Sequence, residues 1–157
     1  MALTHTWHDM VEDMRGEMHD IATITHVAPA RQAFLMLWAT FVVAPILFGI
    51  DKFAGVLTDD WAGYLAGWVN DLVPGTAEQA MYAVGVIEIV AGLVVAVRPK
   101  FGVYLVVAWL AGIIVNLLTI PDYYDIALRD FGLLVGALAL SRLAVAYAPG
   151  RISTSTT

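Results

Sequence analysis

Residues 80–97 form an apolar run that is long enough to cross a lipid bilayer and that holds one ionisable side chain, Glu88. A hydrocarbon core of about 30 Å requires about 20 apolar residues in a helix. A charged group at mid-membrane depth costs about 3 kcal/mol or more unless it faces a partner or a cavity. Glu88 therefore predicts a polar contact inside a membrane protein.

Three further apolar runs have a similar length, and the predicted membrane spans are residues 33–53, 76–97, 101–118 and 126–146. The 157 residues are 60% hydrophobic and 14% charged, whereas a soluble domain is about 25% charged. The runs lack the alternation of barrel strands, so helices must satisfy their backbone polar groups in lipid. We expect an all-α integral membrane protein, with a four-helix transmembrane domain over residues 31–147, after an N-terminal segment over residues 1–30 and before a flexible tail over residues 148–157.

Lysine and arginine residues are distributed unequally between the two ends of the predicted bundle. The end that holds both termini has six of them: Arg15, Arg31, Arg98, Lys100, Arg142 and Arg151. The other end has Lys52 and Arg129. Cytoplasmic loops of membrane proteins carry the excess of positive residues. We therefore expect a multi-pass protein of a bacterial inner membrane with both termini in the cytoplasm.

The N-terminal segment is predicted to form an amphipathic helix. Its apolar stripe consists of Trp7, Met10, Val11, Met14, Met18 and Ile21. The opposite face is acidic, whereas helices that lie on anionic lipid are usually basic. We expect this stripe to bind a protein partner or to fold back onto the bundle.

The first outward loop also has an apolar face at helical spacing. This face consists of Trp61, Tyr64, Leu65, Trp68, Val69 and Leu72. Aromatic side chains favour the headgroup layer of a membrane. The pattern predicts one short interfacial helix that ends at Pro74 and Gly75.

The predicted topology brings most polar residues of the spans into the outward half of the bundle. They are Asp51, Lys52, Glu88, Asn116, Arg129 and Asp130. At 1.5 Å per residue, Glu88 lies roughly 15–18 Å deep. Because unpaired ions are unfavourable there, we expect a network in which Arg129 pairs with Glu88 or Asp130, Glu88 being the favoured partner, and Lys52 pairs with Asp51, Asp125 or Asp130. Such a network can be purely structural, or it can bind a ligand or a proton; alternatively, Glu88 is protonated and faces a partner subunit.

Composition excludes several classes of function. The chain has no cysteine, which excludes disulfides, thiol redox chemistry and thiolate metal sites within it. A net charge of −6 argues against nucleic-acid binding. All histidines lie outside the predicted spans, and no metal site or covalently bound cofactor is predicted. Trp38 and Trp109 are interpreted as lipid-facing or packing residues, and no nucleophile–base pair indicates that this chain alone is an enzyme.

Four features of the spans resemble one known family over about residues 31–145. They are Arg31 before the first span, Gly49-x-x-Lys52-Phe53 at its end, Gly85-x-x-Glu88-x-x-x-Gly92 in the second span, and the polar start of the fourth span. This arrangement resembles the DoxX-like membrane proteins, a family similar to the small membrane subunit of thiosulfate:quinone oxidoreductase. The resemblance implies a four-helix membrane bundle, Lys52 and Glu88 as family positions, and a role near quinone.

Three functional hypotheses follow. The first is a small accessory or assembly subunit of a larger redox or respiratory membrane complex. The second is a membrane protein that binds a quinone or another lipid around Glu88. The third is a small transporter or proton-conducting protein, although four short spans leave little room for alternating access. The expected partners are membrane lipids and either other subunits or further copies of this chain.

Overall fold

The computed structural model describes residues 7, 10–12, 14–16, 18–19 and 28–148. Within these residues the chain is helical and has no strand. Four helices are long and apolar enough to cross a membrane: α2 (Pro29–Ala54), α4 (Ala77–Val97), α5 (Pro99–Leu118) and α6 (Tyr124–Tyr147). The prediction of an all-α chain with four such helices is confirmed. Each helix covers one of the predicted spans, with ends that differ by a few residues.

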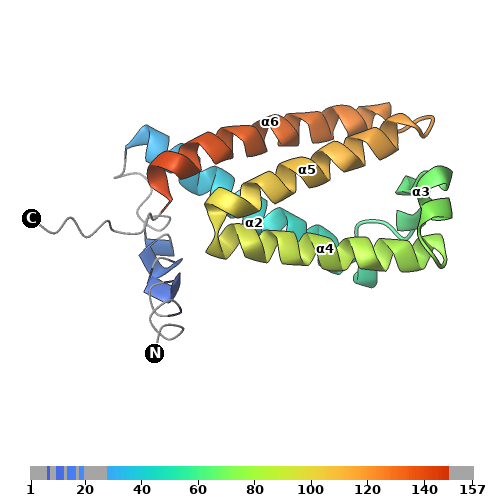
Figure 1. The fold of residues 1–157 in the computed structure, drawn as a ribbon, viewed down its shortest axis with the longest axis horizontal. Coiled ribbons are helices and arrows are strands. Elements are labelled where there is room, and N and C mark those ends of the chain that lie inside the picture. Colours follow the sequence, from blue (N-terminus) through green and yellow to red (C-terminus); the bar gives the residue numbers. More distant parts are fainter. Residues whose placement is uncertain (1–6, 8–9, 13, 17, 20–27, 149–157) are drawn as a thin grey trace, which may run out of the picture.

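The four long helices form two antiparallel pairs (Figure 1). Helix α2 packs along α4, and α5 packs along α6. We call the end near Pro29 and Tyr147 the terminal end, and the opposite end the loop end. Figure 1 shows α4 and α5 leaving their shared turn at the terminal end and diverging toward the loop end, where α3 (Gly67–Leu72) lies.

Local signals explain where the long helices begin and end. Pro29 and Pro99 occupy the first turns of α2 and α5, where a missing N–H group leaves no helical hydrogen bond unmade. Helix α4 begins with a capping box, in which Thr76 and Gln79 bind each other's backbone N–H groups. Helix α2 is followed by the capping residue Gly55, whose φ of 62° lies in the left-handed region that favours glycine.

Glycine residues bring α2 and α4 into backbone contact. A Cβ atom added to Gly49 would lie 2.5 Å from the carbonyl oxygen of Gly85, and one added to Gly85 would lie 2.7 Å from that of Gly49. Gly92 lies against the Val42 carbonyl oxygen in the same way. Small residues allow such close packing between helices in lipid, where hydrophobic association is weak. The contact sets how α2 and α4 are offset along their axes.

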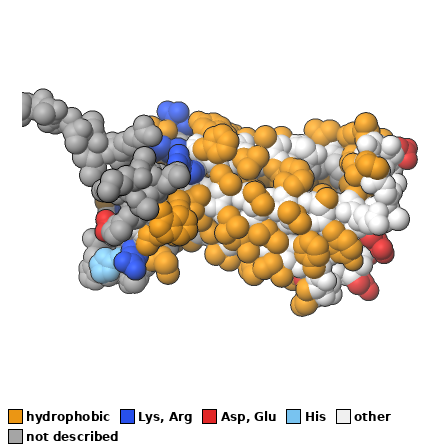
Figure 2. Space-filling view, turned by 60° about the horizontal axis from the view of Figure 1, so that its bottom comes forward, with side chains coloured by type: hydrophobic (Ala, Val, Ile, Leu, Met, Phe, Trp, Pro, Cys, Tyr) orange, Lys and Arg blue, Asp and Glu red, His pale blue; other side chains and the backbone are white. Residues whose placement is uncertain are grey.

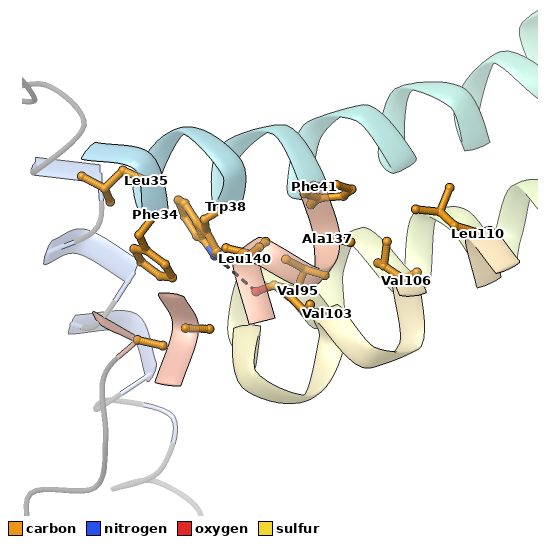
Figure 3. Packing of buried hydrophobic residues seen from close by; sticks show 13 residues of the cluster. Phe34, Leu35, Trp38, Phe41, Val95, Val103, Val106, Leu110, Ala137 and Leu140 are labelled. Carbon is orange, nitrogen blue, oxygen red and sulfur yellow. Dashed lines mark hydrogen bonds between the residues drawn. The ribbon is translucent and has the colours of Figure 1, made fainter. Parts of the chain in front are cut away.

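The main hydrophobic core lies in the terminal half of the bundle (Figure 3). All four long helices contribute fully buried side chains to it: Phe34, Leu35, Val95, Val103, Ala137 and Leu140. Figure 3 shows the Trp38 indole donating a hydrogen bond of 3.2 Å to the Val95 carbonyl oxygen, which links α2 to α4. Trp38 is therefore a packing residue, as predicted.

The first loop differs from the single interfacial helix that the sequence predicts. It contains a 3-10 helix, η2 (Trp61–Tyr64), and the short helix α3, separated by Leu65 and Ala66 in extended conformations. The Asn116 side chain of α5 donates to the Tyr64 carbonyl oxygen at 2.7 Å and accepts from the Ala66 N–H group at 2.9 Å. These bonds use backbone groups that a continuous helix would pair internally, so the helix divides at this point.

Candidate functional site

A buried ion pair joins the two helices that the glycines bring together. The Lys52 amine of α2 lies 2.7 Å from a carboxylate oxygen of Glu88 on α4, and their side chains are only 4% and 11% exposed. Glu88 therefore has the internal partner that its position predicts. The prediction that Arg129 pairs with Glu88 is wrong. The prediction that Lys52 pairs with an aspartate is wrong as well.

The close contact of α2 and α4 explains how Lys52 reaches Glu88. A Cβ atom added to Gly85 would lie 3.2 Å from the Cβ atom of Lys52, so the lysine side chain begins directly beside this glycine. Glu88 lies one helical turn deeper on the same helix, and the four-carbon stem of lysine spans that distance. Lys52 thus begins near the loop end and places its charge farther inside the bundle.

Trp61 covers the lysine from the loop side. The Lys52 amine lies 4.0 Å from the centre of the Trp61 ring, a cation–π contact. The Trp61 indole N–H group donates to the Asp51 carboxylate at 3.1 Å, which holds the ring in place. Asp51 also accepts the backbone N–H groups of Val56 and Leu57 at 2.9 and 3.0 Å. One aspartate therefore fixes both the ring over Lys52 and the backbone that follows α2.

Asn116 and the aromatic side chains hold the rest of the first loop. Besides the two bonds of Asn116 across the break between η2 and α3, Trp68 donates to the Thr119 hydroxyl at 2.9 Å. The Tyr64 ring packs edge-on against Tyr123, with ring centres 5.0 Å apart. The sequence predicts that Asn116 lies in the polar cluster around Glu88. In the structure its side chain binds the backbone of the first loop instead.

Arg129 and Asp130 are adjacent in sequence but face different surroundings. Arg129 pairs with Asp125 at 3.2 Å on an exposed face of α6, with side chains 69% and 72% exposed. Asp130 is half-buried and has no ion pair or hydrogen bond within the described part of the chain. Successive residues of a helix are rotated by about 100° around its axis, so Asp130 faces the bundle where Arg129 does not. This rotation is the physical reason that Arg129 does not reach Glu88.

Sequence reasoning missed two tryptophans of this site, Trp61 and Trp109. The Trp109 indole N–H group of α5 is buried beside the Glu88 carboxylate, but it makes no hydrogen bond of good geometry in the described structure. The Asp130 carboxyl group of α6 also lies near Glu88, and like charges repel each other. Trp109 and Glu88 lie at similar distances from the turn between α4 and α5, and comparing depths along the two spans would have indicated Trp109.

The N-terminal stripe is described only in part. Trp7, Met10, Val11, Met14 and Met18 lie on described helical residues, and the Trp7 and Met18 side chains are exposed. Ile21 lies outside the described residues. The expectation that this stripe binds a partner stays a prediction.

Comparisons with protein-family models, with curated proteins and with solved structures find no match to this chain. The resemblance to DoxX-like proteins therefore stays a prediction that rests on the motifs around Lys52 and Glu88.

Proposed function

We propose that the four long helices cross a bacterial inner membrane and that both termini lie in the cytoplasm. Figure 2 supports this orientation, because lysine and arginine side chains gather toward the terminal end and aspartate and glutamate side chains gather at the loop end. Arg98, Lys100 and Arg142 are exposed near the terminal end. Positive residues concentrate on the cytoplasmic side of membrane proteins.

The absence of cysteine from the sequence makes this topology simple to test. A membrane-impermeant maleimide should label Asp71→Cys, an exposed position of the loop end, in intact cells and Lys100→Cys only after the membrane is opened. Labelling of Lys100→Cys in intact cells, without labelling of Asp71→Cys, would reverse the orientation. Equal labelling of both positions after cell lysis is the control for accessibility.

We also propose that this protein is an accessory or assembly subunit of a larger redox or respiratory membrane complex. The observation that carries this proposal is the closed ion pair of Lys52 and Glu88, whose charges are neutralised inside the chain and covered by Trp61. Such an arrangement suits a rigid scaffold that holds two helices and an outward loop in place. The redox part of the proposal comes from the resemblance to DoxX-like proteins.

Purification in mild detergent tests the accessory role. The tagged protein, expressed in its native membrane, should co-purify at a fixed ratio with a defined set of membrane proteins. Retention of that set in Arg129→Gln and its loss in Lys52→Met/Glu88→Met, which removes the ion pair without leaving one charge buried alone, would connect the ion pair to assembly. A monodisperse protein with no partner at fixed ratio would contradict the accessory role.

A second candidate function is the binding of a quinone or another lipid beside Glu88. The observation that favours it is a pair of polar groups near Glu88 that lack a well-formed hydrogen bond in the described structure: the buried Trp109 N–H group, which lies beside the Glu88 carboxylate, and the half-buried Asp130 carboxyl group. A quinone carbonyl could accept from the Trp109 N–H group, and the hydroxyl group of the reduced quinol or of another lipid could also donate to the Asp130 carboxylate. Buried polar groups in proteins are normally hydrogen-bonded.

Trp109→Phe tests this candidate, because it removes the N–H group and keeps an aromatic ring. Mass spectrometry of lipid extracts should find a quinone or lipid that remains with the purified wild-type protein and is lost from Trp109→Phe and Asp130→Asn. Asp125→Asn, which changes an exposed carboxylate of the same helix, should keep the ligand. Identical extracts from all of these proteins would remove the candidate.

A further inference from the structure

The segment after α2 combines a fixed backbone with exposed apolar side chains. Val56 and Leu57 are 82% and 64% exposed, although their backbone N–H groups are bound to the buried Asp51 carboxylate. Asp51 is in turn held by the Trp61 indole. A backbone fixed before binding loses less conformational entropy when a partner binds. These two apolar side chains are therefore exposed on a backbone that is already held in place before a partner binds.

Acidic side chains surround this end of the bundle. The exposed carboxylates of the loop end are Asp59, Asp60, Asp71, Glu78, Asp122 and Asp125. Of the described cations at this end, Lys52 is buried against Glu88 and Arg129 is paired with Asp125. Figure 2 shows the resulting separation, with aspartate and glutamate side chains at the end opposite the terminal one. The loop end, where Val56 and Leu57 lie, therefore carries an excess of exposed negative charge.

We infer that residues 56–60 are the docking site for a protein partner that has an apolar pocket with a basic rim. This inference rests on the proposed accessory function and names the chemistry of the partner on the outward side. The pocket would receive Val56 and Leu57, while lysine or arginine residues of its rim would face Asp59 and Asp60. Complementary potentials of this kind speed encounter and suppress wrong partners.

The charge pattern favours a protein over the lipid headgroups of the outer leaflet as the occupant. Anionic lipids attract basic segments and repel acidic ones. Val56 and Leu57 lie past the end of α2, and Asp59 and Asp60 follow within three residues. Insertion of the two apolar side chains into lipid would bring both carboxylates toward the headgroups. A basic protein surface accommodates the apolar pair and the carboxylates together.

Photo-crosslinking in the native membrane tests the inference. A benzophenone amino acid at position 57 should form an adduct with one protein, and mass spectrometry should place the linked peptide beside lysine or arginine residues. The same label at position 43, on an exposed part of α2 far from the loop, is the control and should link to lipid. High salt should reduce the adduct at position 57 and leave the adduct at position 43 unchanged.

The double variant Asp59→Asn/Asp60→Asn examines the charge of the rim separately. Asparagine keeps the side-chain oxygen with which Asp60 accepts the Gly63 N–H group at the start of η2, so the loop should fold normally. We expect the adduct at position 57 to be lost in this variant. An adduct that persists, an adduct with lipid alone, or no adduct would overturn the inference.

The proposed function and the docking site can fail separately. If partners co-purify with the wild type and with Asp59→Asn/Asp60→Asn alike, and position 57 links to none of them, the accessory role stands and the docking site is wrong. If no partner co-purifies and position 57 forms no protein adduct, both are wrong.

Discussion

The terminal half and the loop half of this bundle are held together by different interactions. In the terminal half, fully buried apolar side chains such as Phe34, Val95 and Leu140 pack between all four long helices. In the loop half, an ion pair between Lys52 and Glu88 and the hydrogen bonds of Asp51 join α2, α4 and the first loop. The two halves therefore allow a direct comparison of apolar and polar packing within one chain.

The comparison matters because lipid changes the free energies of both kinds of contact. Lipid tails are as apolar as leucine, so burying a leucine between membrane helices gains dispersion contacts without much hydrophobic drive. A charge left alone in the same surroundings is costly, because no water replaces its partner. We therefore expect the loop half to be the more sensitive of the two to single substitutions.

The largest expected effect is that of Lys52→Met. The substitution keeps a long side chain beside Gly85 but leaves the Glu88 carboxylate buried without its cation. Removal of one partner of a buried ion pair typically costs about 3–5 kcal/mol of folding free energy. Equilibrium unfolding in mixed detergent micelles measures the loss.

The double variant Lys52→Met/Glu88→Met is the matched control, because it removes both charges. Replacing a whole buried ion pair by apolar side chains of similar size is often neutral or stabilising. We expect the double variant to recover most of the stability that Lys52→Met loses. A double variant as unstable as the single one would mean that packing at these positions, rather than charge, holds the helices.

The positions of Lys52 and Glu88 could be predicted from sequence, but their pairing could not. The lengths of the apolar runs give the four helices, and the cost of a buried charge marks Glu88 as a residue that needs a partner. The pairing depends on the offset of α2 against α4, which the contact between Gly49 and Gly85 determines. Counting depth from the predicted span ends ignores both this offset and the reach of a lysine side chain.

The loop and the fourth helix were harder to predict, for two other reasons. Apolar spacing over residues 61–72 favours one helix, but Asn116, which is about 50 residues away in sequence, binds backbone groups on both sides of the break. On α6, the choice between Arg129 and Asp130 as the residue that faces inward depends on the rotation of the helix about its axis. The apolar pattern at the start of α6 is too weak to determine that rotation.

The next largest effect is expected for Leu140→Ala in the terminal half. Leu140 is fully buried, and truncation of a buried leucine in a soluble protein costs about 2–5 kcal/mol. In lipid we expect a loss of about 2 kcal/mol, at the low end of that range, because the side chain is also in apolar surroundings when the helices separate. A loss larger than that of Lys52→Met in the same unfolding measurement would contradict the ranking of the two halves.

A smaller effect is expected for Asn116→Ala, which removes both side-chain hydrogen bonds to the first loop. A hydrogen bond of this kind contributes about 1 kcal/mol, and we expect a global loss of that order. Hydrogen exchange should show faster exchange of the Ala66 N–H group and of α3, with no change in α2 near Phe34. Asn116→Asp keeps the acceptor for Ala66 and loses the donor to Tyr64, so it should protect the Ala66 N–H group better than Asn116→Ala does.

The smallest effect is expected for Arg129→Gln, which breaks the ion pair with Asp125. Exposed pairs four residues apart on a helix contribute about 0.3–0.5 kcal/mol, since water or headgroups replace the lost partner. Arg129→Gln and Lys52→Met each remove the cation of one ion pair. The side chains of the Arg129–Asp125 pair are 69% and 72% exposed, whereas those of the Lys52–Glu88 pair are only 4% and 11% exposed. The difference between their unfolding free energies therefore measures what burial adds to an ion pair in this bundle. Equal losses for the two variants would mean that burial adds nothing to an ion pair in this bundle, and would contradict the ranking of the two pairs.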